Sequence, residues 1–212
     1  MTVLDSHRDD WVRQDGAALD VAELPSFAFS HRALTWWATA GMMVIEGVVF
    51  ALAIMTYFYL RSHSMTWPMS RPPPELRWGT LNTLILLASL VPNQWVKGAA
   101  EKLDLPKIRI GLILCLGFGI AFVAVRGYEF TTLNCRWDDN AYGSIVWVLM
   151  GLHTLHLVTD VVDTAVLSVL AFTKRTDGKR FVDISENALY WYFVVLTWLP
   201  IYAVIYWAPR SL

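Results

Sequence analysis

The sequence predicts an all-α, polytopic membrane protein built as a bundle of five transmembrane helices. The chain has 212 residues, of which 56% are hydrophobic, and its mean hydropathy is +0.43. That composition is more apolar than an ordinary soluble domain. Five apolar stretches divide the chain, and none alternates polar and apolar residues as a strand does. Each is long enough to cross a hydrocarbon core about 30 Å thick, which takes about 20 helical residues.

The five predicted helices follow one another with short charged or proline-rich connections between them. In order they are Ala33–Leu60, Trp78–Val96, Ile108–Val125, Tyr142–Phe172 and Asn187–Trp207. Many of the 11 tryptophans fall near the ends of these stretches, and amphipathic rings collect at the lipid–water boundary. Those tryptophans are Trp36, Trp37, Trp67, Trp78, Trp95, Trp137 and Trp207. Residues 1–30 are polar, lack a signal-peptide apolar core, and are interpreted as an arm before a membrane domain at 31–212.

The distribution of lysine and arginine predicts the orientation. The arm and the connections after the second and fourth helices hold eleven of these residues, and the other side holds six. Because the cytoplasmic side carries the excess, we expect a cytoplasmic N-terminus and an outer C-terminus. The connection 126–141, which includes Arg126 and Glu129, then faces the outer compartment. A net charge of −1 gives no indication of nucleic-acid binding.

Glu46 lies near the middle of the first predicted helix. A carboxylate at mid-membrane depth costs about 2.5–3.5 kcal/mol on insertion scales, so it faces protein, water or a partner. Two interpretations remain open. Glu46 is either a hydrogen-bonded carboxyl paired with another helix, or a site that faces a proton-handling partner subunit.

Four titratable residues form a polar stripe on the fourth predicted helix: His153, His156, Asp160 and Asp163. At 100° per residue they fall within about 80° of the helix circumference. We expect them to face the bundle interior or a neighbouring protein, because four such groups facing lipid are very unfavourable. The stripe is either an interhelical hydrogen-bond network that fixes helix order or a proton-storing path. We also predict that Glu46 contacts His153 or His156.

The residue pattern offers no cofactor site. Two histidines at i and i+3 on one helix cannot supply both axial ligands of one haem iron. A di-metal carboxylate centre requires Glu-x-x-His pairs on two helices, and the sequence contains none. Cys115 and Cys135 are the only cysteines and form no CxxC motif. We therefore expect no catalytic residue, no metal site and no disulfide in this chain.

Five strings, taken together in order and spacing, resemble the cytochrome c oxidase subunit III family of the haem–copper oxidases, in a short five-helix form. They are GMMVIEGVVF at 41–50, LNTLILLAS at 81–89, RGYEF at 126–130, GLHTLHL at 151–157, and Glu186 with YWYFV at 190–194 and Trp198. The similarity extends from about Ser30 to the C-terminus. No single string is very specific, but the five in register are.

The resemblance implies a helical subunit without redox cofactors in a hetero-oligomeric complex with oxidase subunits I and II. Haems and copper are then expected in the partner subunits. Packing on subunit I, phospholipid binding and support of proton uptake are also implied, in a bacterial inner membrane. Glu46 falls at the family's carbodiimide-reactive carboxylate. Arg61, Arg126, Trp78 and Trp95 become candidates for contact with lipid headgroups. Separately from the resemblance, small residues on the first helix, among them Gly41 and Gly47, permit close packing, so we expect that helix to press on subunit I or on the fourth helix.

Two departures from the family pattern stand out. The family's last helix usually reads Trp-His-Phe-Val-Asp, where this chain has Tyr192 and Val195 in place of His and Asp. The family usually has glycine where this chain has Asp160, so an exchange of polar partners inside the bundle is one hypothesis. A quinol oxidase or nitric-oxide reductase assembly stays open as the complex, because electron-donor sites lie in other subunits. A stand-alone proton-coupled carrier is the alternative from another class.

Overall fold

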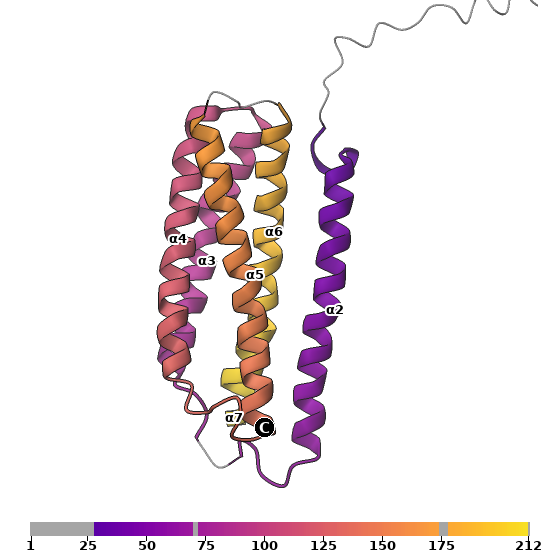
Figure 1. Ribbon diagram of the computed structural model, residues 1–212, viewed down its shortest axis with the longest axis vertical. Helices are drawn as coiled ribbons and strands as arrows, with labels where there is room; N and C mark the ends of the chain where they lie inside the picture. The colour runs from indigo at the N-terminus through magenta and orange to yellow at the C-terminus, as the bar shows by residue number, and fades with distance from the viewer. Residues whose placement is uncertain (1–27, 70–71, 174–177, 212) are drawn as a thin grey trace, which may run out of the picture.

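The computed structural model describes residues 28–69, 72–173 and 178–211, and this part of the chain is all-helical. The described chain forms five long helices, and Figure 1 shows them running alternately up and down along one common direction. They are α2 (Leu34–Ser62), α3 (Leu76–Glu101), α4 (Leu105–Thr131), α5 (Ala141–Phe172) and α6 (Gly178–Tyr202). A 3-10 turn, η1 (Ser30–Arg32), precedes them, and a π-helical segment, η2 (Ala203–Trp207), and α7 (Ala208–Ser211) follow. The predicted fold class is confirmed.

Four of the described helices are both long and apolar enough to cross a membrane: Leu34–Ser62, Leu105–Thr131, Ala141–Phe172 and Gly178–Arg210. Helix α3 has 26 residues, about 39 Å at 1.5 Å per residue, so its length suffices although its composition is more polar. Several of its polar side chains face α6, and Asn82 faces Glu129 of α4. Trp191 Nε1 donates to Ser89 Oγ at 2.8 Å, and Trp198 Nε1 donates to Thr83 Oγ1 at 2.8 Å.

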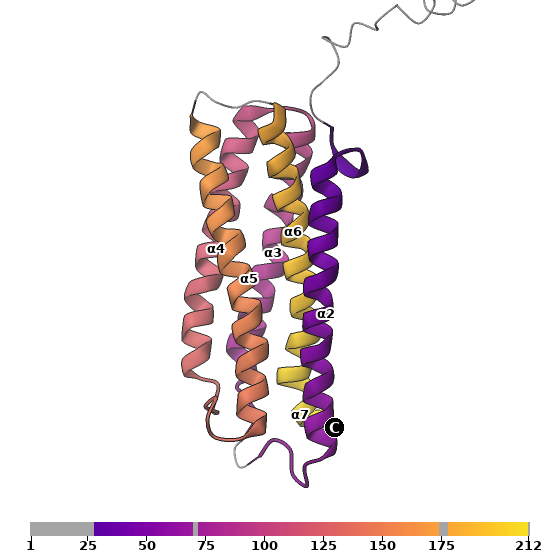
Figure 2. The ribbon, with the colours of Figure 1, turned by 45° about the vertical axis from the view of Figure 1, so that its right-hand side comes forward.

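Helices α3 to α6 form a four-helix group, and α2 packs on one side of it. Each of α3, α4, α5 and α6 contacts two neighbours in the group, whereas α2 contacts α5 and α6. The separate position of α2 is clear in Figure 1, and its approach to α6 is clear in Figure 2. The expected contact between the first and fourth predicted helices is therefore present. The outer face of α2 stays exposed in this chain, with Val44, Ile45 and Met55 each at least 66% accessible.

The connection between α3 and α4 is a tight helix-to-helix turn. Leu103 has a φ of 58°, and its N–H donates to the Ala100 carbonyl oxygen at 3.0 Å. The Asp104 N–H donates to the Ala99 carbonyl oxygen at 3.0 Å, which completes a Schellman ending for α3. Asp104 then caps α4 by accepting from the Lys107 N–H at 3.3 Å. The hydrogen bond from the Lys107 side chain lowers the pKa of Asp104, which lies outside the membrane-spanning segments.

Helix α4 is longer than predicted at its C-terminal end. It continues to Thr131, so Arg126 and Glu129 belong to its last turns and are each 1% exposed. Their placement in an outer connection was wrong, because the two charges pair with each other inside the bundle at 3.0 Å. The connection to α5 begins only at Thr132.

Helix α6 begins nine residues before the predicted start, at Gly178 rather than Asn187. Its first turns contain charged residues, but Phe181, Val182 and Ile184 are buried, so an amphipathic segment extends the apolar run. The arm and its Arg8 and Arg13 lie outside the described residues, except for positions 28–30. Arg71, Lys174 and Arg175, which contributed to the orientation count, lie outside them as well.

Small residues bring α4 and α5 close together. A Cβ atom built on Gly119 would lie 2.6 Å from Val161 Cγ2, so α4 needs a glycine to lie this close to α5. Leu112, Phe122, Leu149 and Trp198, each at most 1% exposed, belong to the buried apolar side chains of the described bundle. In lipid, such packing and interhelical hydrogen bonds hold helices together, because lipid tails are as apolar as the side chains. A rigid four-helix group therefore presents α5 and α6 to α2.

Candidate functional site

Glu46 lies on the face of α2 that meets α5 and α6, with 22% of its side chain exposed. The Tyr190 hydroxyl on α6 donates a hydrogen bond to Glu46 Oε2 at 2.8 Å. His156 on α5 places Nε2 at 3.5 Å from Glu46 Oε1. The predicted contact between Glu46 and one of the two histidines is confirmed for His156. The carboxyl group thus joins three helices at one point.

The hydrogen bonds of His156 restrict where its protons lie. Its Nδ1 is 2.7 Å from the Leu152 carbonyl oxygen, and a carbonyl can only accept, so Nδ1 carries a proton. The Nε2 atom faces Glu46 Oε1, so a carboxyl and an imidazole nitrogen, two groups that can each carry a proton, lie opposite each other. The Phe50 ring, with its centroid 5.0 Å from that of His156, covers one side of the pair.

Asp160 and Asp163 share a single amide donor. Asn187 Nδ2 on α6 donates to Asp160 Oδ1 at 3.1 Å and to Asp163 Oδ2 at 3.2 Å. Asn187 Oδ1 accepts in turn from Thr164 Oγ1 at 3.1 Å. Asp160 is 3% exposed, and among the described residues its Oδ2 atom has no hydrogen-bond partner. Asp160 therefore lies inside the bundle and has a hydrogen-bond donor, as the exchange hypothesis required. The donor is Asn187, which is not one of the two departing positions, Tyr192 and Val195.

His153 occupies a different environment from the other three residues of the polar stripe. It is 0% exposed, and its Nε2 lies 3.0 Å from the Val194 carbonyl oxygen, so Nε2 carries the proton. Its Nδ1 has no hydrogen-bond partner within the described part of the chain. The stripe thus separates into a core histidine, a Glu46-paired histidine and an aspartate pair. Asp163 is exposed in this chain, in contrast to His153 and Asp160.

A second polar cluster lies in the four-helix group, centred on the Arg126–Glu129 pair. Glu129 also accepts hydrogen bonds from the Asn82 side-chain amide and from the Tyr206 hydroxyl. The Arg126 guanidinium lies 4.0 Å from the centroid of the Trp198 ring, where a cation–π interaction compensates part of its lost hydration. Because Arg126 is 1% exposed, it offers no surface to a lipid headgroup, and we drop it from the headgroup candidates.

The other headgroup candidates lie toward helix ends. Arg61 is half-buried in the last turn of α2, and Trp95 is 41% exposed. Trp78 packs on Tyr128, with ring centroids 4.5 Å apart. At the two positions where the sequence departs from the expected family pattern, the Tyr192 hydroxyl donates to Gln94 and Val195 is buried. Neither provides the hydrogen-bond donor to Asp160.

Two grooves flank α2. One, of about 600 Å³, lies between α2, α5 and α6 and is lined by Glu46, Asp160, Asp163, Glu186 and other residues of these helices. The other, of about 580 Å³, lies between α2, α3 and α6 and is almost entirely apolar, with Met43, Leu87, Phe193 and Leu196 in its walls. The two sides of α2 therefore differ in chemistry, one acidic and one apolar.

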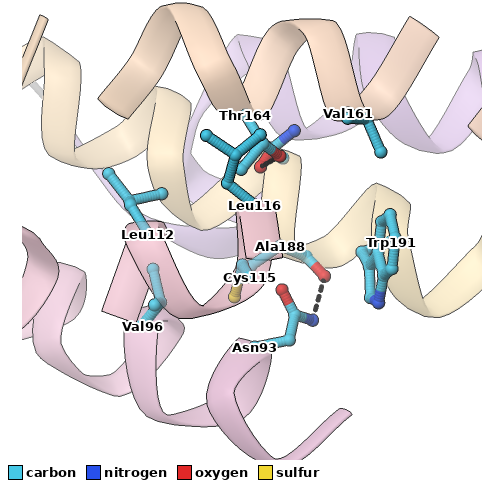
Figure 3. A pocket seen from close by; sticks show the side chains of 10 residues that line it. Asn93, Val96, Leu112, Cys115, Leu116, Val161, Thr164, Ala188 and Trp191 are labelled. Carbon is cyan, nitrogen blue, oxygen red and sulfur yellow. Dashed lines mark hydrogen bonds between the residues drawn. The ribbon is translucent and has the colours of Figure 1, made fainter. Parts of the chain in front are cut away.

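A much smaller cavity lies inside the four-helix group (Figure 3). Its volume is about 10 Å³, the space of roughly one water molecule. Asn93 crosses it from α3 and donates through Nδ2 to the Ala188 carbonyl oxygen at 2.9 Å. Cys115 also lines it, and no disulfide joins Cys115 to Cys135. Within the described ranges, no group of three or more His, Cys, Asp or Glu side chains is arranged to hold a metal ion.

Sequence reasoning missed the α6 partners, Tyr190 and Asn187. They are separated by three positions and so lie on one helical face, which was an available signal. Arg126 and Glu129 have the same i, i+3 spacing that pairs opposite charges on a helix. Both spacings are visible in the sequence, but only the packed structure shows which helix face contacts which neighbouring helix.

Comparison with known proteins identifies what this chain resembles. The family model described as cytochrome c oxidase subunit III matches residues 37–209. Cytochrome c oxidase subunit 3 of Pylaiella littoralis is 25% identical over 174 residues, which cover 78% of this chain and 64% of the relative. The subunit 3 of Thermostichus vulcanus is 25% identical over 171 residues, covering 79% of this chain and 84% of the relative. A probable cytochrome c oxidase subunit 3 of Nocardia farcinica is 29% identical over 179 residues, covering 80% and 83%. The chain thus spans less than two thirds of the Pylaiella protein and more than four fifths of the other two.

Proposed function

This chain belongs to the cytochrome c oxidase subunit III family of multi-span membrane proteins, and on that premise we propose that it is a non-catalytic subunit of a haem–copper terminal oxidase. In this proposal it packs on subunit I in a complex that also contains subunit II, binds phospholipid, and supports aerobic electron transport and proton uptake. The haems and copper of the reaction are held by the partner subunits.

The observation that carries the proposal is the contact of Glu46 with His156 and Tyr190 inside the membrane-spanning bundle. A carboxyl and an imidazole are both groups that can accept and release a proton without a metal. Glu46 is also partly exposed toward the acidic groove, so the proton has a route to the surface of this chain. The group is therefore suited to support proton uptake by an adjacent catalytic subunit.

Phospholipid binding is assigned to the apolar groove between α2, α3 and α6. Its volume of about 580 Å³ and its aliphatic and aromatic walls suit acyl chains. Trp95 and Arg61, toward opposite ends of the bundle, and Trp78 are the residues proposed to contact headgroups. Amphipathic rings and cations at the lipid–water boundary favour this arrangement.

The orientation belongs to the same proposal. The chain crosses a bacterial inner membrane with its N-terminus in the cytoplasm and its C-terminus outside. The start of α2 and the end of α7 lie at opposite ends of the bundle, as an odd number of crossings requires (Figure 1). Residues 1–30 serve as a polar arm and residues 31–212 as the membrane domain.

The proposal is tested by affinity purification of the full chain from its native membrane. We expect co-purification of a chain with the six histidines that ligate haems and copper, and a reduced-minus-oxidised haem spectrum. Oxygen consumption with reduced cytochrome c or with a quinol then identifies the electron donor. Purification of the chain without a haem-containing partner, or transport activity of the chain reconstituted alone, would overturn the proposal.

The role of Glu46 is tested in the purified complex by Glu46→Gln, with Asp138→Asn in an exposed loop as the matched control. Gln keeps a hydrogen-bond acceptor for Tyr190 but cannot exchange the proton. We expect unchanged subunit composition and fewer protons taken up per electron for Glu46→Gln only. Equal proton uptake in both variants would remove Glu46 from the proposal.

A further inference from the structure

We propose that the acidic groove between α2, α5 and α6 receives a lysine or arginine side chain from a membrane helix of a neighbouring subunit, with Asp160 and Asp163 as its binding carboxylates. The inference rests on the proposed function only in requiring a membrane partner. It goes further because it places an ion-pair site at Asp160 and Asp163. Of these, Asp160 stands where the family usually has glycine.

The first support is the charge of the groove. Its described walls contain five carboxylates and one guanidinium. The guanidinium, Arg180, is already 3.3 Å from Asp183 at the end of the groove. The carboxylates deeper in the groove are Glu46, Asp160, Asp163 and Glu186. Glu186 shares a small pocket with Lys97, and Glu46 faces His156. The charge that the described part of the chain leaves without an ion pair is therefore that of Asp160 and Asp163.

The second support is the unmet hydrogen-bonding capacity of two of these carboxyl groups. Asp160 is 3% exposed and Glu186 is 7% exposed. Within the described residues, Asp160 Oδ2 and Glu186 Oε2 each have no hydrogen-bond partner. Two neighbouring carboxyl groups, Asp160 and Asp163, depend on the one amide of Asn187. Such an arrangement is unfavourable for charged carboxylates in a membrane unless a cation or further donors approach, because buried acids are normally paired or kept neutral by a proton.

The depth of the site distinguishes a protein cation from a lipid headgroup. Asp163 and Asp160 precede the end of α5 by nine and twelve residues, about 14 and 18 Å at 1.5 Å per residue. In an aminophospholipid the ammonium is the outermost group and the phosphate lies between it and the acyl chains. A headgroup whose phosphate met Arg180, near the start of α6, would hold its ammonium outside the groove. A long side chain on a neighbouring helix reaches the depth of Asp160 without this conflict.

The arm of this chain is a poor occupant by charge. Residues 1–27 contain six carboxylates and two arginines, so the arm as a whole would be repelled by the groove. A guanidinium or ammonium on an apolar helix fits better, because the walls also contain Met42, Val166 and Leu170. The charged head would meet the aspartate pair, and the aliphatic stem would lie along these apolar side chains.

The test uses the complex purified from native membranes with a benzophenone amino acid at Val166, which lines the groove and is 50% exposed. Illumination should link it to a partner peptide that has Lys or Arg within one helical turn of the linked position. Asp160→Asn with Asp163→Asn should lower that yield at least about tenfold, the range expected when one side of a buried charge pair is removed. Asp138→Asn should leave the yield unchanged. A benzophenone at Ile113 on α4, which is 54% exposed, monitors folding and assembly, since its linking should not respond to the aspartate variants.

Three results would overturn the inference: a lipid adduct alone, a partner peptide without a basic residue nearby, or a yield that neutralisation of both aspartates leaves unchanged. If linking at Ile113 falls as well, the single variants Asp160→Asn and Asp163→Asn are compared at equal assembly. If neither single variant then lowers the cross-linking yield at Val166, that result counts against the site. These outcomes differ from failure of the proposed function, in which the wild-type chain would co-purify with no haem-containing partner.

Discussion

The buried Arg126–Glu129 pair makes a quantitative prediction about stability. Both side chains are 1% exposed and their charged atoms are 3.0 Å apart. Glu129→Gln would leave the guanidinium without its counter-charge in a dry site, where removal of one partner costs about 3–5 kcal/mol. In the wild type, donors of Asn82, Tyr206 and Arg126 share the two carboxylate oxygens of Glu129. In the variant, the glutamine amide has only one oxygen to accept from these three groups. We therefore expect destabilisation toward the upper end of that range.

Arg126→Met should cost a similar amount. It leaves the Glu129 carboxylate with two neutral donors and removes the guanidinium from the Trp198 ring. The double variant Arg126→Met with Glu129→Gln has no charge left in this cluster. It should therefore be more stable than the sum of the single losses predicts, by at least about 2 kcal/mol.

The assay is equilibrium unfolding of the purified chain in mixed detergent micelles, followed by the loss of helical circular dichroism. Asp138→Asn, which removes a charge from an exposed loop pair with Arg136, serves as the control and should give no measurable change. Additive losses in the double variant would show that the two charges do not stabilise each other. The assignment of this cluster to the stability of the fold would then be wrong.

Two further predictions concern packing and pH. Gly119→Ala should destabilise the bundle by about 1–3 kcal/mol, because the new Cβ would lie 2.6 Å from Val161 Cγ2. Gly127→Ala, on the same helix with no atom within 4 Å, is the control, and equal unfolding midpoints would contradict the reasoning. The folded state lowers the pKa of Asp104 through its hydrogen bond with Lys107. That contribution is complete above the ordinary aspartate pKa of about 3.9 and disappears as the pH falls through the lowered value. Melting temperatures of the wild type and Asp104→Asn should therefore differ at pH 6 and converge in acid, and a constant difference would refute the assignment.

The sequence predicts the number and order of the helices well because apolar length is a local property. It predicts helix ends poorly where charged residues turn inward. Arg126 and Glu129 ended the third apolar run, yet they continue α4 because they neutralise each other. The first turns of α6 were missed because Asp183 and Glu186 interrupt the hydropathy, although one face of those turns is buried.

The candidate site was predictable in part for a similar reason. Helical angles place the residues of the polar stripe on one face of α5, and a carboxylate inside a membrane needs a partner, so the sequence predicts that Glu46 contacts His153 or His156. The structure shows that the contact is with His156. The donors on α6, Tyr190 and Asn187, depend on the rotation of that helix about its axis. That rotation is set by its packing against α3 and α5, which no local pattern contains.

The two polar clusters solve different physical problems, and the difference suggests which one concerns a partner. The Arg126–Glu129 cluster balances its charge within the chain, and its acid accepts donors from α3, α4 and the C-terminal helical segment. A set whose charges cancel in this way specifies which helices meet, although Arg126 Nε and Nη2 and Asn82 Oδ1 have no hydrogen-bond partner among the described residues. The groove beside Glu46 differs in charge, because Asp160 and Asp163 form no ion pair within the described part of the chain and Asp160 Oδ2 has no partner there. Acids in a membrane either keep their proton or pair with a cation, and a neighbouring subunit could supply that cation. If the Arg126–Glu129 cluster determines the fold and the groove determines assembly, substitutions in the first should lower the stability of the isolated chain. Neutralising substitutions in the second should leave that stability unchanged or raise it, while they weaken the complex.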